Sequence, residues 1–374
     1  MIYLLAEALE RLGGEWEVFR ILGYTSVRGI GATMTTLLLM LIFAPMVIRH
    51  LYLAGQRDEQ REFDPQLGKS KRGTPTMGGV MIIGSVLISI FLWGNPANVY
   101  LWATISAMVI FGILGAVDDL AKVKGKSADA GLSRGSKLLI QTLFGLALGC
   151  FLFLPATTPF PVEIRDTIGI PFLKPASYGG YDVHLAWGYI IFVTFVVVAV
   201  SNAVNLIDGL DGLAASTTIP PIMVYGVLAF ILGDLRFNAY LLYPSLPGAH
   251  ELIIFVAALV GALVGFLWFN GYPAEVFMGD TGSLSLGGVL AVLVILTKQE
   301  LLFVIAGGLF IFVNATHIIG DQIGLRMLGR RIFYRTPIHH SFEHLGLSET
   351  KVVMRFFIVA MVLALFALAT LKLR

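Results

Sequence analysis

The sequence predicts an all-α integral membrane protein that crosses the bilayer ten times. Of its 374 residues, 57% are hydrophobic and only 13% are charged, whereas soluble domains contain about 25% charged residues. Ten stretches approach the length of about 20 apolar residues that a helix rising about 1.5 Å per residue needs to span the hydrocarbon. We therefore expect one integral membrane domain over residues 1–374, with amphipathic helices and a short β-hairpin outside the spans.

The predicted elements follow one another with short connections. Residues 1–20 contain several glutamates and lack the basic start and cleavage site of a signal peptide, so we expect an amphipathic helix at the membrane surface. Residues 156–185 are rich in Pro, Gly and β-branched residues and predict the hairpin. The ten spans are expected at residues 27–48, 77–94, 98–117, 137–155, 186–204, 213–232, 251–269, 282–297, 301–325 and 352–371.

The positions of lysine and arginine predict the orientation. These residues gather in one alternate set of loops, and cytoplasmic loops carry the Lys/Arg excess. We therefore expect both termini and the hairpin on the opposite, periplasmic side. A net charge of +2 is too small to indicate nucleic-acid binding, and a single cysteine, Cys150, excludes a disulfide framework. The cytoplasmic loops are expected at 49–76, 118–136, 205–212, 270–281 and 326–351.

Five aspartates lie at the expected cytoplasmic ends of the spans. A charged side chain at the centre of a membrane helix costs about 2.5–3.5 kcal/mol, so these carboxylates must lie near helix ends or in a wet cavity. Their gathering from three regions of the chain on one face of a bundle is typical of a metal and phosphate site. The five are Asp118, Asp119, Asp208, Asp211 and Asp280.

The first acidic motif is the pair Asp118-Asp119 at the end of the third span. Successive helical residues point about 100° apart, so the two carboxylates are expected to have separate roles. Lys122 lies four residues after Asp118 and can reach either carboxylate. Taken alone, the motif fits equally well a solvated helix end with an ordinary ion pair.

The second motif repeats an oxygen-bearing side chain every three residues, at Asn205, Asp208 and Asp211. Gly209 and Gly212 allow tight turns and close approach of a ligand to the backbone. A calcium loop of the EF-hand type is excluded because its ligand spacing and closing glutamate are missing. An interhelical turn rich in Asp and Gly is the simpler alternative, although such a turn does not need three aligned oxygen side chains.

Two further motifs carry groups suited to phosphate and nucleotide. Asp280 precedes an apolar run and is expected to cap a helix N-terminus, which also favours phosphate, while Phe277 offers a flat face to a base. His339 and His340 follow several arginines. A zinc site there is a weak alternative, because adjacent histidines lack the usual ligand spacing.

A fifth motif, Lys71-Arg72-Gly73-Thr74-Pro75-Thr76-Met77-Gly78-Gly79, brings basic and hydroxyl groups up to the second span. Together the five motifs, in matching order over residues 20–374, resemble the polyprenyl-phosphate N-acetylhexosamine-1-phosphate transferase superfamily. The fifth motif and Pro337-Ile338-His339-His340 resemble its muramoyl-pentapeptide branch. Two departures are Ser341, where a third histidine is usual, and residues 314–322, which lack a Glu-Thr pattern found in close relatives.

The resemblance implies an enzyme of peptidoglycan synthesis in the bacterial inner membrane, with a cytoplasmic active site. It would transfer phospho-N-acetylmuramoyl-pentapeptide from the UDP-linked donor (UDP-MurNAc-pentapeptide) to undecaprenyl phosphate, giving lipid I and UMP, with Mg²⁺ as cofactor and a homodimer as assembly. Membrane lipids would surround it, and nucleic acid is not an expected partner.

Residue roles follow from the motifs and the resemblance. We expect catalytic roles for Asp118, Asp119, Asp208 and His339, with Asp118 as the candidate base. Metal ligands are expected to be Asp280, assisted by Asp119 or Asp208, since Mg²⁺ prefers carboxylate oxygens and substrate phosphates. Substrate-binding residues are expected to be Lys71, Thr76, Lys122, Lys137, Asn205, Gly209, Leu210, Asp211, Asn270, Phe277 and His340.

Three alternatives remain open at this point. A sister enzyme would transfer N-acetylglucosamine phosphate to the same lipid. A covalent phospho-enzyme on Asp118 or Asp119 would replace direct attack by the lipid phosphate. An ion-coupled transporter is a candidate of another class, but it predicts carboxylates near the middle of the membrane and inverted repeats.

Overall fold

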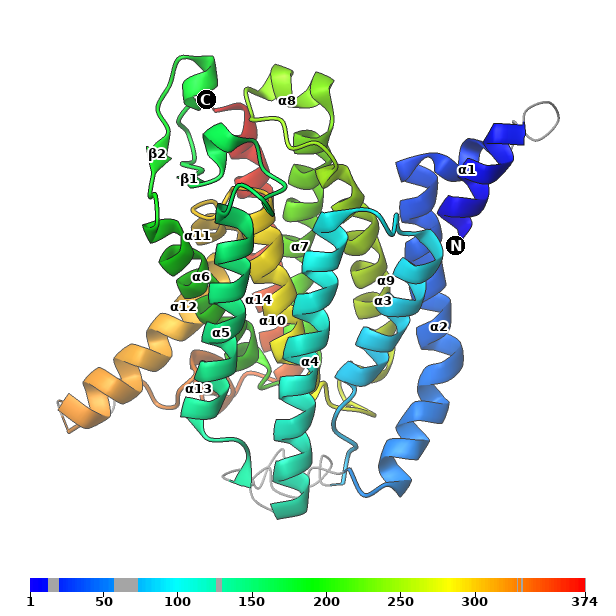
Figure 1. Cartoon of the computed structure of the whole chain (residues 1–374). Helices are drawn as coiled ribbons and strands as arrows, with labels where there is room; N and C mark the ends of the chain where they lie inside the picture. The colour runs from blue at the N-terminus through cyan, green and yellow to red at the C-terminus, as the bar shows by residue number, and fades with distance from the viewer. Residues whose placement is uncertain (13–19, 57–72, 126–129, 328, 331, 374) are drawn as a thin grey trace.

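The computed structural model describes residues 1–12, 20–56, 73–125, 130–327, 329–330 and 332–373. It is a bundle of long helices with one small two-stranded ladder (Figure 1). The long helices are α2 (Thr25–Leu53), α4 (Val99–Gly125), α5 (Arg134–Phe153), α6 (Gly188–Ile207), α7 (Leu213–Gly233), α9 (Leu252–Asn270), α10 (Gly279–Leu296) and α14 (Glu349–Ala369). The shorter helices are α1 (Ile2–Leu12), α3 (Gly79–Trp93), α8 (Leu235–Leu241), α11 (Phe303–Ala306), α12 (Gly308–His317) and α13 (Ile338–His344).

The predicted all-α membrane class is confirmed. Within the described residues, nine helical segments are long and apolar enough to cross a membrane. The second predicted span, 77–94, corresponds to α3, which has only 15 residues and is the shorter apolar helix of the set. The number of ten crossings therefore stays a prediction. Large apolar side chains such as Trp102 and Ile113 are more than half exposed on the outside of α4, as expected for a surface that faces lipid tails.

One predicted span differs from the structure. We expected a single helix over residues 301–325, but the chain forms α11, breaks at Gly307, and continues as α12 and a π-helical segment, η7 (Ile318–Met327). Figure 1 shows α12 and η7 leaving the bundle sideways. The expectation of one unbroken helix is therefore wrong at Gly307, but the part from Gly308 to Leu325 is still long and apolar enough to cross a membrane.

The centre of the bundle is α10, in which every residue from Thr281 to Leu296 is buried. This helix packs chiefly against α4 and α6. Small residues permit the approach: a Cβ added at Gly287 would lie 2.7 Å from Cα of Ser201 in α6, and one at Gly288 would lie 2.7 Å from the Phe111 ring in α4. Close packing of backbones through glycine is the usual way helices associate where lipid supplies no hydrophobic driving force.

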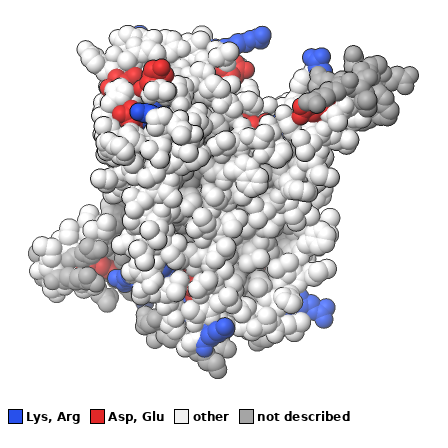
Figure 2. Space-filling view, viewed as in Figure 1, with Lys and Arg blue, Asp and Glu red and all other residues white. Residues whose placement is uncertain are grey.

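On the face drawn in Figure 2, the charged side chains of the described residues lie towards the two ends of the molecule. Figure 2 shows a broad belt without Lys, Arg, Asp or Glu around the middle of the visible face, with acidic side chains gathered mainly at the upper end. That end holds both chain termini and the ladder of β1 (Thr167–Ile168) with β2 (Val183–His184), which pair antiparallel inside the predicted hairpin segment. The uncharged belt fits the hydrocarbon region of a bilayer.

The hairpin is fastened to the bundle by a buried lysine. Lys298, 2% exposed, donates from Nζ to the carbonyl oxygens of Arg165 at 2.7 Å and Thr167 at 3.2 Å. Its Nζ also lies 3.8 Å from the ring centroid of Tyr189. Burial lowers the pKa of Lys298 to about 7, against the opposing pull of the Glu300 carboxylate, and burial raises the pKa of Glu300.

We expect Lys298 to make stability depend on pH. Its folded pKa of about 7 lies below the ordinary 10.5, so between these values the unfolded chain binds more protons and stability rises with pH. Thermal unfolding in detergent at about pH 7 and about pH 9.5 should therefore show a gain for the wild type that Lys298→Met loses. Glu300→Gln measures the contribution of the Glu300 carboxyl, whose raised pKa makes stability fall as pH rises. Equal pH responses of wild type and Lys298→Met would contradict the assignment.

Candidate active site

The end of α4 and the start of α10 cross at very short range. A Cβ added at Gly115 of α4 would lie 2.1 Å from the backbone oxygen of Asp280, so only glycine fits. On the other side of α10, a Cβ at Gly79 of α3 would lie 2.2 Å from the backbone nitrogen of Gly282. Because the nearest atoms in both cases belong to the backbone, the start of α10 fits closely between α3 and α4. Gly115 lies one helical turn before the pair Asp118-Asp119.

Asp119 caps the start of α10. Its carboxylate accepts hydrogen bonds from Asp280 N at 3.0 Å, from Thr281 N at 2.9 Å and from Thr281 Oγ1 at 2.7 Å. Asp119 is 4% exposed. The N–H groups of a first helical turn have no partner within the helix, and a carboxylate also interacts favourably with the helix dipole. Asp119 therefore fixes the position of Asp280, and a metal-binding role for it stays a prediction.

Asp118 faces the other way and is fully buried. Its carboxylate accepts from Leu132 N at 2.6 Å and forms ion pairs of 2.7 Å with both Lys122 and Lys137. The separate directions expected for the two adjacent carboxylates are thus seen in the structure. The loop before α5 contributes the backbone donor, and the first turn of α5 contributes Lys137.

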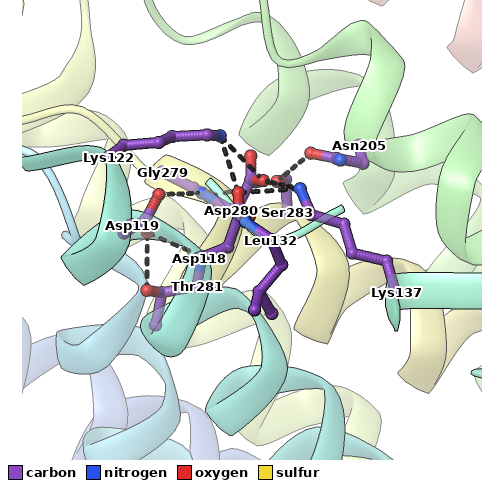
Figure 3. A network of polar contacts seen from close by, with 10 residues as sticks. All are labelled: Asp118, Asp119, Lys122, Leu132, Lys137, Asn205, Gly279, Asp280, Thr281 and Ser283. Atoms are coloured by element: carbon purple, nitrogen blue, oxygen red, sulfur yellow. Dashed lines mark hydrogen bonds and ion pairs between the residues drawn. The ribbon is translucent and has the colours of Figure 1, made fainter. Parts of the chain in front are cut away.

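Two lysines bridge Asp118 and Asp280 (Figure 3). Lys122 lies 3.0 Å and Lys137 lies 2.9 Å from Oδ2 of Asp280, whose side chain is 16% exposed. The two carboxyl groups are also within hydrogen-bonding reach of each other. Asp118, Asp119, Lys122, Lys137 and Asp280, here called the acid–lysine cluster, thus join α4, α5 and α10.

The loop that follows α6 lies beside this cluster. Asn205, in the last turn of α6, accepts a hydrogen bond of 2.7 Å from Ser283 of α10, as Figure 3 shows. Asp208 comes one turn later, at the end of α6. Leu210 is buried in the core at 5% exposure. Asp208 is thus placed at the same end of the bundle, and its role at the metal stays a prediction.

Two loops and the start of α14 meet around residues 208–212. Gly212 N donates to Asn270 Oδ1 at 3.0 Å, and Asn270 Nδ2 donates to the Val276 oxygen at 2.8 Å. Asp211 Oδ2 accepts from Ala274 N at 3.1 Å, while Asp211 N donates to Glu349 Oε1 at 2.7 Å. The backbone of this loop is therefore held on both sides.

The histidines lie directly against the same loop. A Cβ added at Gly209 would lie 2.3 Å from Nε2 of His339 and 3.1 Å from Nε2 of His340. His339 is fully buried, whereas His340 is partly exposed and pairs with Glu343 at 2.9 Å. Ser341, the departure from the usual third histidine, donates to the Arg335 oxygen and accepts from Arg335 N at 3.0 Å, so it folds the preceding turn.

Two other predicted residues lie next to the start of α10. Phe277 is 6% exposed, and its N–H donates to the Pro75 oxygen at 2.8 Å. Thr76 lies beside Gly279, at which an added Cβ would be 3.0 Å from Thr76 Oγ1. Lys71 lies outside the described residues. Thr76, near the end of the positively charged motif that precedes the second span, therefore lies beside the acid–lysine cluster.

Sequence reasoning missed Glu349, Thr281 and Ser283 as parts of the site. Thr281 and Ser283 lie within the quoted Asp280 motif, where a helix start with hydroxyl side chains could have indicated hydrogen bonds to other elements. Glu349 starts the last long helix directly after Ser348. An acid in a first helical turn is ordinary, so nothing in the local sequence distinguishes Glu349 from a surface residue.

The fold and the site define the class as a multi-pass membrane transferase. Residues 101–298, more than half of the chain, match the family described as Glycosyl transferase family 4. Residues 71–83 match the phospho-N-acetylmuramoyl-pentapeptide-transferase signature 1. The chain is also 43% identical over 374 residues to the phospho-N-acetylmuramoyl-pentapeptide-transferase of Geobacter sp. (strain M21), covering 99% of this chain and 100% of that relative. The chain belongs to the phospho-N-acetylmuramoyl-pentapeptide-transferase family.

Proposed function

We propose that this chain transfers phospho-N-acetylmuramoyl-pentapeptide from its UDP-linked donor to undecaprenyl phosphate, forming lipid I and UMP. The observation that carries the proposal is the acid–lysine cluster, in which two lysines join two carboxylates at the start of a buried helix. Family membership supports the choice of substrates. The active site would face the cytoplasm of the inner membrane, with the termini and hairpin in the periplasm and a homodimer as the assembly.

The residues present fit a magnesium ion. Mg²⁺ binds through one or two carboxylates together with substrate phosphates and water. Asp280 and Asp118 lie within hydrogen-bonding reach of each other, and two carboxylates so close need compensating cations, which Lys122 and Lys137 supply here and Mg²⁺ would supply once the lysines contact the diphosphate. Among the described residues no group of three acidic, histidine or cysteine side chains is placed to hold a metal ion, so substrate phosphates and water would have to complete the coordination. Asp280 would hold it, assisted by Asp119 or Asp208, and bound Mg²⁺ would neutralise diphosphate charge.

In the proposed reaction, a phosphate oxygen of undecaprenyl phosphate attacks the phosphorus that carries the sugar. A new P–O bond forms there, the P–O bond to the uridine phosphate breaks, and UMP leaves. Lys122 and Lys137 have their ammonium groups beside the carboxylates and would move to the diphosphate oxygens, with Lys71 assisting. Asp118 would accept the remaining proton of the lipid phosphate, and His339 would place the diphosphate.

The nucleotide would bind against residues 209–211. The Asp211 N–H is held by Glu349 and the neighbouring Gly212 N–H by Asn270, so the remaining backbone N–H and C=O groups of residues 209–211 would be presented to a uracil ring at low entropic cost. Phe277 would stack on the base or ribose, Thr76 and Asn205 would contact the phosphate side, and His340 would contact the sugar. These assignments follow from the family resemblance, and the positions of the two loops support them.

Assays of the purified protein with both donors test the proposal. With undecaprenyl phosphate in detergent, we expect UMP and a lipid-linked product from the muramoyl-pentapeptide donor, and none from UDP-N-acetylglucosamine. Chelation with EDTA should abolish the reaction, and added Mg²⁺ should restore it. Equal turnover of both donors, or full activity in EDTA, would overturn the substrate or the metal assignment respectively. Rapid-quench release of UMP without the lipid would instead favour a covalent route through Asp118 or Asp119.

A further inference from the structure

Glu349 is a buried acid that takes part in no chemical step of the proposed reaction. It lies in the first turn of α14, 3% exposed, and its Oε1 accepts the backbone N–H of Asp211 at 2.7 Å. Burial of a carboxylate is unfavourable unless hydrogen bonds compensate it, so we expect a buried glutamate to have a structural or functional role. This bond joins it to the backbone of the loop proposed to hold the nucleotide, 138 residues away in the chain.

The opposite side of that loop is anchored independently. Asp211 Oδ2 accepts from Ala274 N at 3.1 Å, and Gly212 N donates to Asn270 Oδ1 at 3.0 Å. These bonds join residues 208–212 to the α9–α10 connection. Glu349 supplies a separate bond from α14, which follows α13 and its histidines in the chain. The loop at Asp211 and Gly212 is therefore held by two structural elements.

The same unit that carries Glu349 also carries the histidines. His339 is in α13 (Ile338–His344), which connects to α14 through four residues, and its Nε2 lies where a Cβ on Gly209 would be only 2.3 Å away. The segment α13–α14 thus contacts the loop at Gly209 through His339 and at Asp211 through Glu349. Any shift of Glu349 would change the spacing between His339 and the backbone of residues 209–211.

We infer that Glu349 is a positioning residue for the nucleotide donor. It holds the Gly209–Asp211 backbone at the distance from His339 that the donor requires. The inference rests on the proposed function for the identity of the donor, while the geometry concerns only the loop. Since the acid–lysine cluster is held by other contacts, the lipid acceptor and the chemical step should be much less affected than donor binding.

Three variants test this role. Glu349→Met keeps the length of the side chain but removes the acceptor oxygen, whereas Glu349→Gln keeps a carbonyl oxygen that can accept from Asp211 N. A hydrogen bond to a charged acceptor is strong enough to change binding about tenfold to a hundredfold. We expect Glu349→Met to raise the KM for the donor about tenfold or more, with the KM for undecaprenyl phosphate and kcat changed less than about threefold. Glu349→Gln should restore a near-wild-type donor KM. Lys351→Ala, an exposed charge on the same turn of α14, is the matched control.

The outcomes separate a positioning role from a structural one. Equal rises in both KM values with a lowered thermal midpoint, or an unchanged donor KM in Glu349→Met, would overturn the inference. So would failure of Glu349→Gln to restore the donor KM. If Glu349→Met does not fold, Glu349→Asp, whose carboxylate is one methylene shorter, should show the rise in donor KM alone. If the wild type uses a different UDP-sugar, the proposed function fails, and the same comparison is made with that donor.

Discussion

Asp280→Asn is expected to lower kcat/KM about a hundredfold to a thousandfold, the range seen when one electrostatic contact to a developing charge is removed. Asp280 Oδ2 is the oxygen on which Lys122 and Lys137 both converge. An amide has the same shape but no charge, so it binds a divalent cation weakly and leaves the two ammonium groups with Asp118 as their remaining shared carboxylate. The loss should therefore appear in catalysis before it appears in folding.

The magnesium dependence of Asp280→Asn is the decisive measurement. Initial rates of UMP release in detergent over a range of Mg²⁺ concentrations should show a higher apparent requirement for the ion as well as a lower maximum. Glu163→Gln, an exposed acid in the hairpin segment far from the cluster, serves as the control and should leave both quantities unchanged. Retention of more than about a tenth of the activity, with an unchanged Mg²⁺ profile, would remove Asp280 from the metal site.

Gly115→Ala is expected to give the second large effect, although Gly115 bears no functional group. Its new methyl group would lie 2.1 Å from the Asp280 oxygen and 2.5 Å from Thr281 N. Both atoms belong to the backbone, so α4 and α10 must move apart. That movement separates Asp118 and Asp119 from Asp280, and a misplacement of about 1 Å at a reacting group lowers the rate about a hundredfold.

A matched glycine isolates the effect of the crossing. Gly84 lies in α3, and a Cβ added there would meet nothing within 4 Å. Gly84→Ala should leave activity unchanged and stabilise the helix by about 0.5–1 kcal/mol. Rates and thermal midpoints of both variants should be measured in the same detergent. Wild-type activity in Gly115→Ala would show that the spacing of α4 and α10 does not set the geometry of the site.

Most of the architecture could be predicted from the sequence because its signals are local. Continuous apolar runs predicted the membrane class, and eight of the expected spans overlap long single helices of the structure. The ninth expected span is interrupted at Gly307, although Gly308–Leu325 remains long and apolar enough to cross a membrane. The motif at residues 156–185 predicted the hairpin, while the buried lysine that fastens it, Lys298, carried no local signal.

For the site, the sequence supplied the chemistry but not the contacts. Residue types and their placement at span ends were sufficient to single out Asp118, Asp119 and Asp280, and the family resemblance added their expected roles. That Asp119 caps α10, while Asp118 pairs with Lys137, depends on which way two adjacent side chains point once α4 crosses α10. The local sequence of a helix start does not depend on the elements that pack against it, so these partners could not be predicted.

The sequence by itself determined that this protein lies in a membrane, which segments form helices, and which acidic, basic and histidine side chains carry its chemistry, because hydropathy and residue type are properties of each segment alone. Only the tertiary structure decided that two lysines bridge Asp118 and Asp280, and that Glu349 holds the Asp211 loop. The physical reason is that such contacts join residues separated by up to about 160 positions, and their distances are set by glycine-permitted helix crossings that no local pattern encodes.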